Sequence, residues 1–444
     1  MVVNQTHTPK WPYFFGLIWF GQFMSVIGSA LTGFALGVWI FQQTGSATQY
    51  GLMILAVSLP GILLSPVAGV LVDRWDRRWT MILSDTGAGL CTVLIWWLLV
   101  SNHIVLWQIY ALLALSSVFN ALQWPAYSSS TTVLVPKSYF GRATGMIQLG
   151  EGIAQVIAPA IAGTLLAILH IEGVIFIDFA TFLFAVLTLL LVRIPRPPKT
   201  QEGEASKGSF WQEVAYGWRF IRARPGLLGM LLFFAGVNLT EGMVIVLIVP
   251  LVLGFANEVT LGIVMSVAGS GALVGAVAMS IWGEPKKLVA HGVLGATLVR
   301  GIILLLGGLK PNAVLVAAAA FIFLFSFQIM LGSSQVLWMH KVPADVQGRV
   351  FATRRMIAWI STPIAYLLAG PLADTIFEPL LQANGYLAPT VGKIIGVGPG
   401  RGIGLLFIVL GSLTILITLL AYAYKPLRLV EESLPDAAGN EILP

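Results

Sequence analysis

Charged residues are scarce in this chain of 444 residues: 10% are Asp, Glu, Lys or Arg, whereas 57% are hydrophobic. A soluble globular domain carries about 25% charged residues, because its surface must face water. The mean hydropathy of +0.88 indicates that most of this surface faces an apolar environment. The composition therefore argues against a soluble domain and predicts a protein surrounded by a lipid bilayer.

Cysteine is almost absent as well. The single cysteine, Cys91, lies in an apolar run, so a disulfide within the chain is impossible and a thiolate metal site is disfavoured. The five histidines are scattered, and the sequence has no H-E-x-x-H, G-x-S-x-G or Walker A pattern. These absences argue against an ATP-driven pump and against an enzyme, and we expect no cofactor and no metal. A membrane-embedded enzyme is a lower-ranked alternative, since it would need a clustered catalytic set.

Long apolar runs are abundant. A helix needs about 20 mostly apolar residues to cross a hydrocarbon core of about 30 Å. This rule predicts an all-α membrane protein with about twelve transmembrane helices. The expected helices are 12–41, 47–72, 79–100, 104–134, 140–169, 171–193, 226–253, 258–283, 287–308, 312–340, 346–374 and 401–424.

The basic residues predict the orientation. The net charge of +6 does not indicate nucleic-acid binding, because Lys and Arg lie in short segments between apolar runs. Most of the 25 Lys and Arg residues share one side of the membrane if the N-terminus is cytoplasmic. The positive-inside rule then predicts that both termini are cytoplasmic.

Two segments interrupt the helical pattern. Residues 194–225 open with a proline-rich, charged linker and continue with an amphipathic stretch, typical of a helix on the cytoplasmic leaflet. A plain flexible linker is the alternative. The expected domains are therefore 1–193, a six-helix half, and 226–444, a second six-helix half with a short cytoplasmic tail. The outer loop 375–400 is a connection or a lid over the outer mouth.

A short motif occurs once in each half. Val135-Pro136 is followed by Gly141-Arg142 before the fifth helix. In the same way, Val342-Pro343 is followed by Gly348-Arg349 before the eleventh. Both copies fall in cytoplasmic loops at equivalent places. This coincidence favours duplication over chance and predicts two parallel halves, which is a known transporter architecture.

The loop between the second and third helices carries a family resemblance. It reads G-V-L-V-D-R-W-D-R-R from Gly69 to Arg78. This resembles motif A of the major facilitator superfamily, G-x-x-x-D-R-x-G-R-R, with Asp76 where the family has glycine. With the V-P-x4-G-R repeat, it resembles the bacterial branch of macrolide-efflux-like exporters, which includes siderophore exporters. The likeness covers about 12–425.

Motif A implies a gate. Gly69 permits close helix approach, and Asp73 lies at the cytoplasmic end of a helix, where a carboxylate needs a partner. Nearby or opposite arginines are candidates for that partner: Arg74, Arg77 and Arg78 in the motif, and Arg354 and Arg355 in the other half. Such a cluster would latch the outward-open state. The alternative is that these arginines only set the topology.

The fifth helix resembles the antiporter motif of the superfamily, G-x8-G-x3-G-P-x2-G-G. The corresponding residues are Gly145, Ala154, Ala158, Pro159, Ala162 and Gly163. Small residues permit tight packing and proline bends the helix. This favours an exporter working by antiport over an ordinary tightly packed helix. Drug antiporters of the family often carry an arginine in the fourth helix, where this chain has Ser116, which argues against a proton relay there.

Charged residues within the apolar runs are candidates for a transport pathway, because burial in lipid costs several kcal/mol. They are Asp85, Glu151, Asp178, Glu241 and Arg300. Glu151 and Arg300 fall near the midplane, whereas Asp85 and Asp178 fall nearer the faces and are interpreted as structural. We expect Glu151 or Glu241 to take up a proton as substrate leaves. A fixed pair with Arg300 that holds helices together is an equal alternative.

Polar and aromatic residues could line an amphipathic cavity for the substrate. On the fourth helix these are Gln123 and Tyr127, with Asn120 and Trp124, and on the fifth Gln148 and Gln155. Trp and Tyr are also enriched at membrane interfaces, so packing is the alternative for each aromatic.

The residues and the resemblance together imply a function. We expect a secondary active transporter of the bacterial inner membrane, a monomer that exports a small amphipathic, macrolide-like or drug-like compound by alternating access, coupled to protons. A dedicated siderophore or natural-product exporter is the nearest alternative. Nutrient uptake and a non-transporting receptor rank lower.

Overall fold

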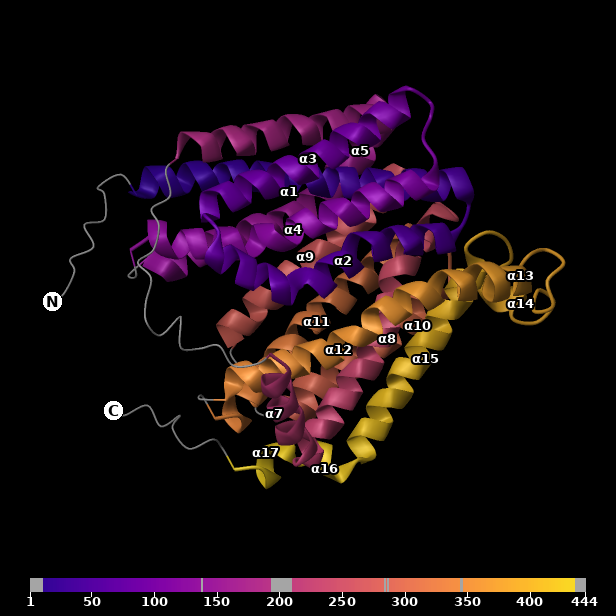
Figure 1. The fold of residues 1–444 in the computed structure, drawn as a ribbon. Helices are drawn as coiled ribbons and strands as arrows, with labels where there is room; N and C mark the ends of the chain where they lie inside the picture. The colour runs from indigo at the N-terminus through magenta and orange to yellow at the C-terminus, as the bar shows by residue number, and fades with distance from the viewer. Residues whose placement is uncertain are drawn as a thin grey trace. The chain divides into compact units, whose positions relative to one another are not determined.

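The computed structural model of the protein describes residues 11–136, 139–192, 210–282, 285, 287–343 and 346–435. The elements in these ranges are helices (Figure 1). Eleven of them are long and apolar enough to cross a membrane. One of the eleven, α5 (Phe140–Leu191), is broken in the middle and supplies two crossings, so the described helices supply the twelve that were predicted.

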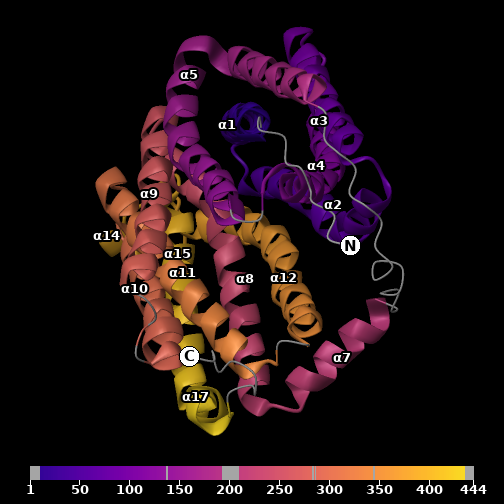
Figure 2. The same ribbon diagram turned by 90° about the vertical axis from the view of Figure 1, so that its left-hand side faces the viewer.

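The break in α5 lies at His170. An uninterrupted helix of these 52 residues would be about 78 Å long, far more than a hydrocarbon core of about 30 Å. His170 has φ 56° and ψ −178°, values that end one helix and start the next. Figure 2 shows the sharp turn between the two lengths of α5. The predicted boundary between 140–169 and 171–193 is therefore confirmed.

One compact unit, unit 1, contains the described residues of Met1–Gly45, Leu52–Thr200 and Leu261–Ser266. Its helices are α1 (Trp11–Thr44), most of α2 (Ala47–Arg74), α3 (Arg77–Val100), α4 (Leu106–Leu134) and α5. The first helix packs along α5, and α3 packs on both α4 and α5. Gly21 and Gly28 of α1 permit the close packing of α1 on α5, because an added Cβ would collide with Thr188 and Thr181 of α5.

The other compact unit, unit 2, contains the described residues of Ser46–Gly51, Gln201–Thr260 and Val267–Pro444. Its elements are α7 (Phe210–Arg222), α8 (Pro225–Leu253), most of α9 (Glu258–Trp282), η2 (Leu288–Gly295), α10 (Ala296–Gly308), α11 (Ala313–Lys341), α12 (Gln347–Pro371), η3 (Leu372–Phe377), α13 (Glu378–Leu380), α14 (Gly392–Ile395), α15 (Arg401–Ala423), α16 (Lys425–Arg428) and α17 (Val430–Ser433). Here α8 packs on α12 and α15, and α10 packs on α11 and α15. Glycines at 301 and 411 bring α10 and α15 close together.

The amphipathic stretch predicted between the halves forms α7, which packs on α12 and α8. Trp218 and Arg219 are exposed, whereas Ile221 is fully buried. The proline-rich part of the predicted linker, 194–209, lies outside the described residues. The helix is thus found where the pattern predicted it, and its position on the cytoplasmic leaflet stays a prediction.

The repeated motif has the same local structure in both copies. Val135 is the C-cap of α4 and Val342 is the C-cap of α11, both with extended backbone angles. In each copy the next helix begins a few residues later, at Phe140 and at Gln347. The helix ends that flank the two copies are therefore equivalent, as duplication predicts.

The segment 375–400 is folded by backbone hydrogen bonds. The amide of Leu387 donates to the Leu380 carbonyl and that of Gly398 to the Leu381 carbonyl, each at 3.0 Å. The Glu378 carboxylate accepts from the amides of Gly400 (3.2 Å) and Ile403 (2.8 Å), and so caps the start of α15. The loop is an ordered connection between α12 and α15.

Candidate substrate-binding site

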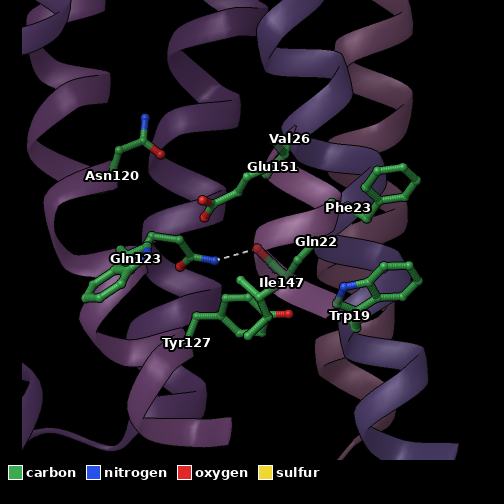
Figure 3. Close-up of a pocket in the computed structure, with 11 residues that line it drawn as sticks. Trp19, Gln22, Phe23, Val26, Asn120, Gln123, Tyr127, Ile147 and Glu151 are labelled. Carbon is green, nitrogen blue, oxygen red and sulfur yellow. Dashed lines mark hydrogen bonds between the residues drawn. The ribbon is translucent and has the colours of Figure 1, made fainter. Parts of the chain in front are cut away.

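A pocket of about 200 Å³ lies within unit 1 among α1, α4 and α5 (Figure 3). Each helix contributes residues at intervals of three and four, the spacing that places side chains on one helical face. The lining residues are Trp19, Gln22, Phe23 and Val26 of α1, Asn120, Gln123, Trp124 and Tyr127 of α4, and Ile147, Gly150 and Glu151 of α5.

Five of the residues predicted from sequence meet in this pocket: Asn120, Gln123, Trp124, Tyr127 and Glu151. Glycine at 150 lets α5 approach α1, because an added Cβ would lie 3.1 Å from the Phe23 ring. The Glu151 side chain is exposed to the pocket, and its carboxylate points toward Asn120 and Gln123 (Figure 3). The predicted lining residues Gln148 and Gln155 are exposed and are not part of this pocket.

Aromatic rings form the apolar wall on α1. The rings of Trp19 and Phe23 stack, with centroids 5.4 Å apart and planes inclined by 1°. The Trp19 indole N–H donates to the Met146 carbonyl of α5 at 2.9 Å, which holds the ring in place. Flat apolar surfaces beside a carboxylate and amides suit a compound that has both apolar and polar groups.

Amide side chains connect the pocket to a buried carboxylate. Nε2 of Gln123 donates to Oε1 of Gln22 at 2.9 Å, and Nε2 of Gln22 donates to Oδ2 of Asp85 at 2.9 Å. Oε1 of Gln123 and the Tyr127 hydroxyl are buried and have no hydrogen-bond partner among the described residues. Buried polar atoms of this kind are costly unless a ligand or water meets them. The sequence reasoning missed Gln22, although its position on the face of Trp19 and Val26 was a usable signal.

Glu241 and Arg300, the other two charged candidates, lie together in unit 2. Arg300 Nη2 is 3.1 Å from Oε2 of Glu241, and only 1% of the arginine side chain is exposed. The guanidinium lies over the rings of Phe323 (4.2 Å) and Phe327 (5.1 Å) of α11. The geometry is that of a fixed ion pair between α8 and α10, which was the alternative to a proton site.

The arginines at the start of α3 bond to main-chain carbonyls. Arg77 Nη1 donates to the Ser129 carbonyl at 2.8 Å, and Arg78 donates to Leu189 (2.9 Å) and Leu190 (2.7 Å). The latter two carbonyls end α5, where a cation is favourable. Three predicted gating residues, Gly69, Asp73 and Arg74, are outside the part of the structure whose side-chain environment is described.

The candidate gating partners in unit 2 are differently placed. Arg354 donates to Oγ of Ser334 (3.0 Å) and Oε1 of Gln335 (3.3 Å) and lies 5.0 Å from the Trp338 ring centre. These contacts tie α12 to α11, while Arg355 is exposed. A gating role for either arginine stays a prediction.

The comparisons with known proteins establish the family. The model of the Major Facilitator Superfamily matches residues 18–366. The chain belongs to this superfamily. Its members, and the relatives described next, are transporters and not enzymes, so the chain is a multi-pass membrane transporter.

Two relatives carry functional names. Macrolide efflux protein A of Streptococcus pyogenes is 27% identical over 381 residues, which cover 83% of this chain and 91% of the relative. Multidrug efflux pump Tap of Mycobacterium bovis (strain BCG / Pasteur 1173P2) is 25% identical over 377 residues, which cover 81% of this chain and 86% of the relative.

A solved structure supports the fold. A bacterial homologue of the human lysosomal transporter Spinster, crystallised in an inward-facing and unoccupied conformation, has a TM-score of 0.71 at 15% identity. The alignment covers 95% of this chain and 97% of that chain. The predicted all-helical facilitator fold is therefore confirmed.

Membership of the superfamily makes one departure in motif A informative. The family has glycine where this chain has Asp76, and here Asp76 is the N-cap of α3, with its carboxylate accepting from the Trp79 amide at 3.2 Å. A carboxylate at this position satisfies a free helix amide and favours helix formation. The substitution is thus compatible with the loop.

The antiporter-like motif forms a buried small-residue face. Ala154, Ala158 and Ala162 are at most 2% exposed, and Gly163 is also buried. Residues Leu261–Ser266 of α9 belong to unit 1. Among them, Gly262 lies so close to the Pro159 carbonyl that an added Cβ would collide with it. Gly145, at the other end of the motif, has open space around it. Tight packing is therefore observed along the alanine part of the motif, and its link to antiport stays a prediction.

Proposed function

We propose that this transporter exports a small amphipathic organic compound from bacteria across the inner membrane, as a monomer, in exchange for protons. The observation that carries the proposal is the pocket of unit 1. It combines the Trp19 and Phe23 rings with the Glu151 carboxylate and with two buried polar atoms, on Gln123 and Tyr127, that have no protein partner. The names of the two relatives, macrolide efflux and multidrug efflux, support the same substrate class.

Each part of the pocket has a role in this proposal. The rings provide apolar surface, while the amides and the hydroxyl orient the polar edge of the substrate. Glu151 attracts a substrate that carries a positive charge. Alternating access moves the bound compound outward, with motif A controlling the change of state and both termini in the cytoplasm.

Efflux of fluorescent dyes and macrolides from bacteria that express the protein tests the proposal. We expect energy-dependent efflux that a protonophore abolishes. Glu151→Gln should reduce efflux of a cationic dye about 10-fold or more, because a hydrogen bond to a charged group contributes about 1.5–3 kcal/mol. Glu172→Gln is the matched control, since it removes the same charge from α5 at a residue that does not line the pocket.

The outcomes separate the alternatives. Equal losses in Glu151→Gln and Glu172→Gln would show that the pocket does not select the substrate. Efflux that persists with a protonophore would refute proton coupling. Protein that reaches the membrane but exports no tested drug would favour a dedicated exporter of a siderophore or another natural product.

A further inference from the structure

We propose that Asp85 is a proton-binding site of this transporter and that Gln22 and Gln123 connect its charge state to the substrate pocket. The coupling part of this inference rests on the proposed export function; the proton-binding part does not. Sequence position suggested a structural role for Asp85, near one face of the membrane. The structure instead connects it to the pocket wall by two hydrogen bonds of 2.9 Å each.

Among the described residues, Asp85 forms no ion pair with a cation that would compensate its charge. The residue is 8% exposed, and Gln22, its hydrogen-bond donor, is 6% exposed. Neither α1 nor α4 contains an Asp, Glu, Lys, Arg or His residue, and their titratable side chains are tyrosines, Tyr127 among them. Because an isolated buried carboxylate is very costly, the neutral, protonated form is favoured.

The remaining two helices around Asp85 have charges that are engaged elsewhere. On α3, Arg77 and Arg78 donate to main-chain carbonyls about two turns before Asp85. On α5, Arg142 lies over the Tyr139 ring and His170 is at the helix break. The acidic residues of α5 are Glu151, Glu172 and Asp178, and none of them can act as a counter-ion for Asp85.

The hydrogen bonds of the Gln22 and Gln123 amide groups all point the same way. Each amide donates an N–H toward Asp85, and the far end is Oε1 of Gln123, a buried acceptor that no described residue meets. A substrate N–H or O–H group that donates to this oxygen would complete a chain of donors ending at the carboxylate. Hydrogen bonds in such a chain polarise one another, so a bound cationic donor stabilises the ionised form of Asp85.

Substrate binding and proton release are linked in this way. When a donor occupies Oε1 of Gln123, the O–H bond of the Asp85 carboxyl group breaks and the proton passes to water; no other bond changes. When the substrate leaves, the carboxylate loses that stabilisation and takes up a proton again. The amides transmit polarity and do not themselves carry the proton.

Infrared spectroscopy tests the proton-binding part without any substrate. The full-length protein, labelled with carbon-13 at Asp carboxyl groups and held in lipid nanodiscs, should show the C=O stretch of a protonated carboxyl group at neutral pH. Asp85→Asn should remove the Asp85 component of this band, whereas Asp178→Asn should retain that component. Asp178 is a matched control because it is also buried, on α5, and accepts from Ser29 instead of from a pocket residue. A band that is unchanged in Asp85→Asn would overturn the proposal.

Transport in proteoliposomes tests the coupling part. Asp85→Asn should keep substrate counterflow but lose accumulation driven by a pH gradient, and Asp85→Glu, which restores a carboxyl group, should regain part of it. Gradient-driven accumulation by Asp85→Asn at the wild-type level would overturn the coupling. If the wild-type protein transports no dye, the export function fails while the infrared result still decides whether Asp85 binds the proton. Loss of counterflow in Asp85→Asn together with normal counterflow in Asp85→Glu would overturn the relay, since the carboxyl group would then serve binding.

Discussion

The membrane-embedded carboxylates of the two compact units have different partners. In unit 2, Glu241 lies 3.1 Å from the guanidinium of Arg300, which is itself enclosed by phenylalanine rings. In unit 1, Asp85 is met by the amide groups of Gln22 and Gln123 and forms no ion pair among the described residues, while Glu151 opens into a pocket. A charge that is matched inside the protein holds helices together, whereas an unmatched one is available for a proton or a substrate.

A third group of carboxylates is matched by helix amides. The Asp374 carboxylate accepts from the hydroxyls of Ser46 (2.6 Å) and Thr48 (2.7 Å) and from two amides at the start of α2. Glu431 accepts from the amides of Leu288 (2.9 Å) and Val289 (3.0 Å) at the start of η2. These residues act as helix caps at the ends of unit 2, so their expected effect is on stability.

The largest expected effect comes from breaking the matched pair. Arg300→Met should reduce the free energy of unfolding by about 3–5 kcal/mol, because it leaves the Glu241 carboxylate without its cation. Thermal unfolding of the purified protein in detergent measures this loss. The double variant Glu241→Leu with Arg300→Met should recover most of it, since both charges are then gone.

Lys310→Met is the control for that pair, because it removes an exposed cation just after α10. It should leave the unfolding temperature unchanged. A double variant as unstable as Arg300→Met alone would show that Arg300 stabilises α10 by packing and not by matching Glu241.

An intermediate effect is expected at the caps. Glu431→Ala should lower the free energy of unfolding by about 1–2 kcal/mol, since two amides at the start of η2 lose their acceptor. Glu432→Ala removes the same charge from the adjacent exposed position and should have a smaller effect. Chemical denaturation of the two variants compares them, and equal losses would contradict a capping role.

The smallest effect on stability is expected at the unmatched carboxyl group. Asp85→Asn should change the free energy of unfolding by less than about 1 kcal/mol, because the amide has the shape of the protonated acid and still accepts from Gln22. The same thermal assay measures it beside Arg300→Met. A loss as large as that of Arg300→Met would indicate that Asp85 is ionised and matched by a charge, contrary to the comparison.

The membrane-spanning helices were predictable from the sequence, although α1 extends to Thr44 and the short helices α13, α14, α16 and α17 were not predicted. Twenty or so apolar residues can be accommodated in a membrane only as a helix, so hydropathy alone located α8 and α15 within a residue or two of their observed ends. Even the break at His170 was predicted, because the continuous apolar run was too long for one crossing. The capping role of Asp76 was not, since the family motif directed attention to the missing glycine.

The candidate site was predictable only in part. Helical spacing grouped Gln123 with Tyr127, and burial of charge in an apolar run singled out Glu151, Glu241 and Arg300. The sequence left open whether Glu241 and Arg300 pair, and it did not show that Asp85 is hydrogen-bonded to Gln22. Depth along a helix was the only measure available for Asp85, and depth does not show which neighbouring helix faces it.

The sequence by itself determined the number of crossings, the predicted orientation and the family, because these depend on hydrophobicity, charge and motifs along one chain. Tertiary structure alone decided the partners: Arg300 for Glu241, Gln22 for Asp85, and the meeting of α1, α4 and α5 around Glu151. The physical reason is that a buried charge is defined by the groups within a few ångströms of it, and in a helical membrane protein those groups come from other helices.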